Sequence, residues 1–302
     1  MSRGWRRCAG LLLGLGISLG AHASSVRLCD QSLELNAEQK DKLFRLGGVI
    51  KAELDKSGHG VALMSRSGLD LSRFGQRYSH AGFSLKASPD TPWAVRQLYY
   101  ACDEQRPRIY DQGVSGFLLG TDDPAIGYVS VVFLPKAEAD RLERAALDNR
   151  QALALLGPVY SANAYAFGKR YQNCNQWVAE MLATAWGSWP ADDTPRAQAQ
   201  RWLQDQGYAP TLIDVGDRIL LWLSALFVPW LHTNDHPSED LRQAHYRISM
   251  PASIEAFIHE TVPGATRMEF CHTDRHIVVR RGWAPIAEGC VPGEQDTVLA
   301  LD

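Results

Sequence analysis

Hydrophobic residues recur along this chain with two periods, one typical of helices and one typical of strands. Residues 37–54 place their leucines and isoleucine three or four positions apart, which predicts an amphipathic helix, and Asn36 precedes it as an N-cap candidate. The same spacing predicts further helices at 137–156, 173–186, 194–206 and 253–259. Short apolar or β-branched runs predict strands at 61–64, 79–86, 93–100, 128–134, 268–270 and 277–281. This mixture favours an α+β fold.

Two neighbouring strands are expected to form a hairpin across the Pro-Asp-Thr-Pro turn at 89–92. A turn centred on its first two residues places His80 opposite Tyr99. Because side chains repeat on one face of a strand every second residue, Gln97 and Tyr99 would then share a face with His80. A register slip of one residue would reverse that face.

The first residues have the pattern of an export signal. Basic residues precede an uncharged apolar run at 9–20, and a small-x-small motif ends at Ala23. The run is shorter than the roughly 20 residues that span a bilayer, which disfavours the alternative of a membrane anchor. We therefore expect residues 1–23 to be a signal peptide, cleaved after Ala23, and the mature protein to be periplasmic or secreted.

Export changes the interpretation of the cysteines, because disulfides form in oxidising compartments. The mature chain would hold five of them, an odd number, so at least one thiol stays free or pairs outside the chain. Cys271 and Cys290 flank a compact C-terminal segment and are candidates for a local bridge. Cys29 and Cys102 are the second candidate pair, tying the mature N-terminus to the first sheet. This pairing leaves Cys174 free.

Composition and charge exclude one class of function. The 302 residues are 45% hydrophobic and 22% charged, which is typical of a globular protein. The formal net charge is -3, and neither sign forms a long block. A nucleic-acid-binding protein would carry a basic surface, so we expect no nucleic-acid partner.

Cys174 is the candidate nucleophile. A thiolate attacks a carbonyl, so a catalytic cysteine is helped by a helix N-terminus and by a nearby imidazolium, both of which lower its pKa. Cys174 begins a predicted helix, and His80 opens a predicted strand between small neighbours. Gln97 is the first choice, and Tyr99 the second, for the group that orients the histidine. The alternative is that Cys174 is a buried structural cysteine and His80 a satisfied core histidine.

The segments SHAGF at 79–83 and NCNQW at 173–177 resemble the circularly permuted NlpC-type branch of the papain-like superfamily. Over a longer stretch, which includes 93–100 and the tail CHTDRH at 271–276, the chain also resembles the bacterial domain of unknown function family 2145. The first resemblance covers mainly residues 60–186 and implies Cys174 as nucleophile and His80 as general base. It also implies an antiparallel sheet carrying His80. Gln97 departs from the histidine or acidic residue expected at the third position.

The resemblance implies a papain-like core at 24–210 and an α+β extension at 211–302 packed on it. The expected function is that of a cysteine hydrolase or acyltransferase acting on an amide, ester or thioester of a cell-envelope peptide or lipid, with no cofactor. The alternative is a catalytically silent envelope binding or assembly module on the same scaffold. A thiol-redox role lacks the Cys-x-x-Cys pair that would support it.

Two other segments invite functional interpretations. His232 and His236 are four residues apart, among acidic residues and near His245, which is compatible with a metal site. Pro237 argues against the helix that such a site would need, so we expect no metal. The apolar run 219–231 is too short to cross a membrane and contains Pro229. It is either a core helix or an interfacial lid that gives the protein a peripheral membrane contact beside a lipid-binding groove.

Overall fold

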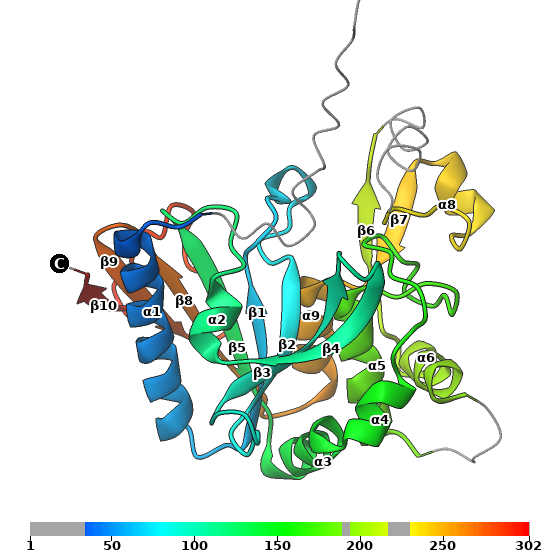
Figure 1. Cartoon of the computed structure of the whole chain (residues 1–302), viewed down its shortest axis with the longest axis horizontal. Coiled ribbons are helices and arrows are strands. Elements are labelled where there is room, and N and C mark those ends of the chain that lie inside the picture. The colour runs from blue at the N-terminus through cyan, green and yellow to red at the C-terminus, as the bar shows by residue number, and fades with distance from the viewer. Residues whose placement is uncertain (1–33, 189–193, 217–229, 302) are drawn as a thin grey trace, which may run out of the picture.

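The computed structural model describes residues 34–188, 194–216 and 230–301. The expected signal peptide, Cys29 and most of the apolar run 219–231 lie outside these ranges. The described chain is a mixed α+β structure built around one large antiparallel sheet (Figure 1). The fold class expected from the sequence is confirmed at this level.

The sheet has eight strands in the order β10-β9-β8-β5-β1-β2-β3-β4, and each neighbouring pair is antiparallel. Its strands are β1 (Val61–Arg66), β2 (His80–Leu85), β3 (Ala94–Ala101), β4 (Arg106–Gln112), β5 (Gly127–Phe133), β8 (Thr266–His272), β9 (His276–Arg281) and β10 (Thr297–Ala300). A separate two-stranded sheet pairs β6 (Thr211–Asp214) with β7 (His245–Ile248).

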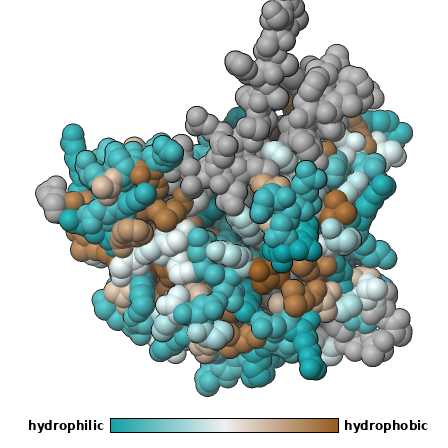
Figure 2. Space-filling view, in the orientation of Figure 1, coloured by the Kyte–Doolittle hydropathy of each residue, from teal (hydrophilic) through white to brown (hydrophobic). Residues whose placement is uncertain are grey.

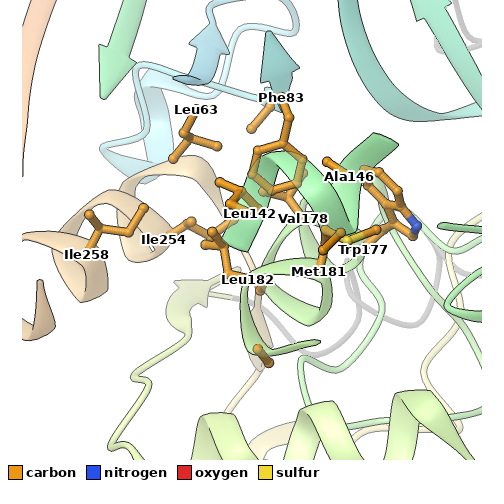
Figure 3. Close-up of a cluster of buried hydrophobic side chains, with 14 of the residues drawn as sticks. Leu63, Phe83, Leu142, Ala146, Trp177, Val178, Met181, Leu182, Ile254 and Ile258 are labelled. Carbon is orange, nitrogen blue, oxygen red and sulfur yellow. The ribbon is translucent and has the colours of Figure 1, made fainter. Parts of the chain in front are cut away.

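Helices cover both faces of the large sheet. The described helices are α1 (Ala37–Lys56), α2 (Val114–Leu118), α3 (Lys136–Leu147), α4 (Asn149–Ala154), α5 (Cys174–Trp186), α6 (Pro195–Asp205), α8 (Ser238–Arg242), which packs on the small sheet, and α9 (Pro251–Thr261). One apolar cluster joins α3, α5 and α9 to the sheet (Figure 3), and a second joins α1 and α2 to the opposite face. Strand alternation separates the two clusters, since Leu63 of β1 packs on the α5 side and Met64 on the α1 side.

The C-terminal strands belong to the large sheet itself. Strand β8 pairs with β5 along its whole length, from Thr266 opposite Phe133 to His272 opposite Gly127. The sequence analysis predicted a core at 24–210 and an extension at 211–302 packed on it. The pairing of β8 with β5 joins these two regions in one sheet.

The disulfide between Cys271 and Cys290 is confirmed, with Cα atoms 5.7 Å apart. Cys102 is also disulfide-bonded, whereas its expected partner Cys29 lies outside the described residues. Cys174 is the free cysteine of the described chain.

One expected helix is divided in two. The predicted helix 137–156 consists of α3 and α4, and Asp148 between them has an extended backbone. Its carboxylate accepts hydrogen bonds from the backbone N–H groups of Arg150 and Gln151 at 2.8 and 3.3 Å. Asp148 therefore acts as an N-cap that starts a new helix.

The surface shown in Figure 2 is mostly hydrophilic, with separate hydrophobic patches between the charged residues. Among the described residues, no helix is both long enough and apolar enough to span a bilayer.

Candidate active site

Cys174 is the first residue of α5. Asn173 caps this helix, because its backbone is extended and its Oδ1 accepts a hydrogen bond from the N–H of Gln176 at 2.7 Å. Behind the cap, Trp177, Val178 and Met181 pack into the cluster that holds α5 against the sheet (Figure 3). The cap and the packing together fix the position of the thiol at the helix N-terminus.

A buried charge network fixes the loop that leads to Cys174. Glu180 of α5 is fully buried, and its carboxylate accepts from the Arg196 guanidinium at 2.9 Å and from the Gln172 amide at 2.6 Å. Gln172 in turn accepts from the Gly157 N–H at 2.7 Å, and Arg196 donates to the Tyr171 carbonyl at 3.1 Å. Burial raises the pKa of Glu180, and the Arg196 charge opposes that shift. The loop between Gly157 and Cys174 is thereby tied to the body of the protein.

The hairpin of β2 and β3 has the register expected from its turn. The two strands pair from Phe83 opposite Arg96 to Leu85 opposite Ala94, and extending this register by three residues places His80 opposite Tyr99 and Gln97 on the same face as His80. The Gln97 Oε1 lies 2.5 Å from Nε2 of the His80 ring. Tyr99 instead faces Tyr110, with ring centroids 6.1 Å apart. Of the two expected orienting residues, Gln97 is therefore the one that contacts the imidazole.

Gln112 extends this contact to a third strand. The Gln97 Nε2 donates to Gln112 Oε1 at 3.0 Å, so His80, Gln97 and Gln112 form a hydrogen-bonded row across β2, β3 and β4. Gln112 was not among the predicted site residues, because no predicted strand contained it. A full strand after the β3 turn, with period-2 side chains, is the signal that would have found it.

The starts of α5 and β2 meet at one end of the sheet. The Asn175 Nδ2 donates to the backbone carbonyl of Ser79 at 3.1 Å, directly before His80. Along β2, Ala81 and Phe83 pack on the α5 side, so alternation turns His80 toward α2, where its ring centroid lies 5.8 Å from that of Phe117. Cys174 and His80 thus begin two elements in contact, and these two described side chains are not hydrogen-bonded to each other.

Several groups around the Cys174 thiol favour its anion. The backbone N–H of Asn175, the positive charge of Arg66 and the Tyr160 hydroxyl each favour the thiolate and act to lower the thiol pKa. Burial opposes all of them, because Cys174 is only 7% exposed, and it raises the thiol pKa to about 11. The lowered pKa expected from the helix N-terminus is therefore outweighed by desolvation.

The same physical causes keep His80 neutral. Burial lowers the imidazole pKa to about 3, the nearby charge of Arg66 lowers it further, and the bond to Gln97 acts in the opposite direction. Arg66 pairs with His80 in the β1–β2 register, so one guanidinium acts on both candidate groups. At neutral pH the pair is a protonated thiol and a neutral imidazole.

Three aromatic side chains, beginning with Tyr160 near the thiol, contact one another in a row. The Tyr160 ring stacks on that of Tyr100 with centroids 4.9 Å apart, and Tyr100 lies 6.3 Å from Trp230. The Trp230 carbonyl accepts from the Ala162 N–H at 2.9 Å. The C-terminal end of the apolar run 219–231 is therefore held against the loop that carries Tyr160.

The histidines that suggested a metal have other partners. The His236 ring donates from Nε2 to the Asn163 carbonyl at 2.7 Å, and the His232 N–H donates to Asn163 Oδ1 at 3.0 Å. Within the described ranges, no group of three histidine, cysteine or acidic side chains is arranged to hold a metal ion. These histidines connect the 230–236 segment to the loop before Cys174.

The protein also has a cavity of about 600 Å³ at the opposite end of β1. Its walls include His59, Phe133, Arg281 and Trp283. None of Cys174, His80 and Gln97 lines it. The cavity is therefore separate from the candidate site.

The fold and the site together define a mixed α+β protein with a free, buried cysteine at a helix start and a histidine oriented by an amide. Residues 53–258, more than half of the chain, match the family described as uncharacterized protein conserved in bacteria (DUF2145), and the chain belongs to this family. No curated protein and no solved structure matches the chain.

Proposed function

We propose that this protein is an exported cysteine hydrolase or acyltransferase with a permuted NlpC-type, papain-like core. Its substrate would be an amide, ester or thioester of a cell-envelope peptide or lipid. In this proposal Cys174 is the nucleophile, His80 the general base and Gln97 the residue that orients His80. The disulfide-bonded cysteines support an oxidising compartment, and hence export.

The observation that carries the proposal is the chemistry around the thiol. A cysteine that only fills space in a core needs no polar partner. Cys174 instead lies at the start of α5, near the Tyr160 hydroxyl and the Arg66 charge, and each of these favours negative charge on the sulfur. The same donors suit the oxyanion of a tetrahedral intermediate.

The proposed reaction starts from the neutral pair. As the Cys174 sulfur bonds to the substrate carbonyl carbon, its proton passes to the free nitrogen of His80, and the carbonyl oxygen becomes an oxyanion. Collapse expels the leaving amine, alcohol or thiol, which takes the proton from His80. Water, or an acceptor amine, then attacks the acyl-enzyme, loses a proton through His80 and restores the thiol. These steps require the His80 ring, which lies beside Phe117 of α2, to reach the Cys174 sulfur at the start of α5.

A burst experiment tests the proposal. The mature protein is mixed with excess p-nitrophenyl acetate, and nitrophenol release and acetyl-enzyme mass are followed. We expect one acetyl group on Cys174, no acetylation of that site in Cys174→Ala, and at least a tenfold slower burst in His80→Ala, since general bases contribute about 10²-fold or more.

The opposite result favours the second function. If folded Cys174 is neither acetylated nor alkylated, while unfolding exposes it to both reagents, the enzyme proposal is wrong. The silent binding or assembly module would then stand, and the 7% exposure of Cys174 is the observation that favours it.

A further inference from the structure

We propose that Gln112 is a positioning residue that selects which nitrogen of His80 carries the proton. The inference rests on the proposed function, because it concerns the base of the same site. Gln112 does not touch His80 itself; it acts through Gln97.

The amide of Gln97 can present either its oxygen or its NH₂ group to His80. In the structure its Nε2 donates to Gln112 Oε1 at 3.0 Å, which turns Oε1 toward the His80 ring. An oxygen at that position only accepts, so the ring must carry its proton on Nε2. The lone pair of Nδ1 is then free to take the thiol proton.

The reverse orientation of Gln97 would remove the base. Its NH₂ group would donate to the Nε2 lone pair, and the ring proton would move to Nδ1. A neutral imidazole in that tautomer has no lone pair left for the thiol. The orientation of the Gln97 amide therefore decides whether His80 has a lone pair that can accept the thiol proton.

Gln112 is itself restrained. A Cβ added at Gly116 would lie 2.8 Å from Gln112 Cγ and 3.0 Å from its Nε2, so this glycine in the middle of α2 leaves room for the Gln112 side chain and no more. The close approach limits where the Gln112 side chain can lie, and in that position its Oε1 accepts from Gln97. Gly116 thus leaves space for Gln112, and the hydrogen bond from Gln97 Nε2 to Gln112 Oε1 gives the row its direction.

The test compares two substitutions of similar size. Gln112→Glu keeps an oxygen that can only accept from Gln97, whereas Gln112→Met has no acceptor of comparable strength. Gln151→Met, on α4, is the matched control for loss of a glutamine amide elsewhere. The His80 tautomer is measured in each ¹⁵N-labelled mature protein by two-bond ¹H–¹⁵N correlation, with His80→Gln used to assign the signals.

We expect the Nε2–H tautomer alone in the wild type, in Gln112→Glu and in Gln151→Met, and a mixture of tautomers in Gln112→Met. The acetylation burst should fall about tenfold in Gln112→Met and be retained in Gln112→Glu, as expected if the base is partly lost. In Gln112→Glu the added negative charge should raise the His80 pKa, and the acidic limb of the profile of burst rate against pH should therefore move to higher pH.

The inference is overturned if Gln112→Met keeps the wild-type tautomer, if the wild type carries Nδ1–H, or if Gln112→Glu loses the tautomer as fully as Gln112→Met. Its failure is distinguishable from failure of the proposed function. Tautomers that behave as expected in a protein without any burst would show that Gln112 positions His80 although Cys174 is not a nucleophile.

Discussion

The side-chain amide of Asn175 donates to the backbone carbonyl of Ser79 at 3.1 Å. This hydrogen bond joins the helix that begins with Cys174 to the strand that begins with His80. It is a direct link between the two halves of the candidate site. Its removal should affect stability and chemistry together.

Asn175→Ala should lower the free energy of unfolding by about 1 kcal/mol, the usual net contribution of a hydrogen bond. Urea unfolding measures this, with exposed Asn149→Ala as the control. We also expect the acetylation rate of Cys174 to depend less on His80 in the Asn175→Ala background. Equal effects of His80→Ala in both backgrounds would show that this hydrogen bond does not couple the two residues.

The raised pKa of Cys174 predicts how the thiol titrates. Because that pKa is about 11, alkylation by iodoacetamide should rise about tenfold per pH unit until pH approaches 11. The folded state also holds the thiol proton more tightly than the unfolded chain, so stability should fall as pH rises from about 9 to 11. Cys174→Ser should lack this fall, and urea unfolding at several pH values compares the two proteins. A thiol that titrates near pH 7 would contradict the prediction.

The lowered pKa of His80 predicts a loss of stability on the acidic side. Between its ordinary value of 6.5 and the folded value of about 3, the unfolded chain binds a proton that the folded protein does not. Stability should therefore decrease as pH falls through that window. His80→Gln should be less acid-sensitive than the wild type in urea unfolding between pH 4 and 7, whereas parallel curves would count against a neutral imidazole in the folded protein.

The buried pair of Glu180 and Arg196 predicts a large effect on folding. Arg196→Met leaves the Glu180 carboxylate buried without its cation, which should cost about 3–5 kcal/mol. Adding Glu180→Gln should restore part of that loss, since an amide tolerates burial better than a carboxylate. Arg141→Ala, which breaks an ion pair at the surface, should change stability by less than about 1 kcal/mol. Thermal or urea unfolding of the three variants would separate these cases.

Local patterns predicted the parts of the site that local chemistry determines. The turn at 89–92 defined the hairpin register, and that register placed Gln97 beside His80. The helical period after Asn173 located Cys174 at a helix start. The spacing of Cys271 and Cys290 was enough to suggest their bridge.

The remaining site residues depend on contacts that no short pattern contains. Tyr160 lies in an aperiodic loop, and Arg66 lies beyond the expected end of its strand. The sequence therefore could not predict that either residue lies near the Cys174 thiol. The pKa of Cys174 is the clearest case. A helix N-terminus lowers a thiol pKa locally, but the burial that reverses this effect comes from packing between distant segments.

The pairing of β8 with β5 has a consequence for producing the protein. The family match ends at residue 258, whereas β5 is covered by β8 from residue 266 onward. A recombinant fragment cut at the family boundaries would leave the fully buried strand Gly127–Phe133 with an open backbone edge. Such an edge recruits other chains, so a fragment of this kind should precipitate, and crystallisation trials should retain the C-terminal strands β8, β9 and β10.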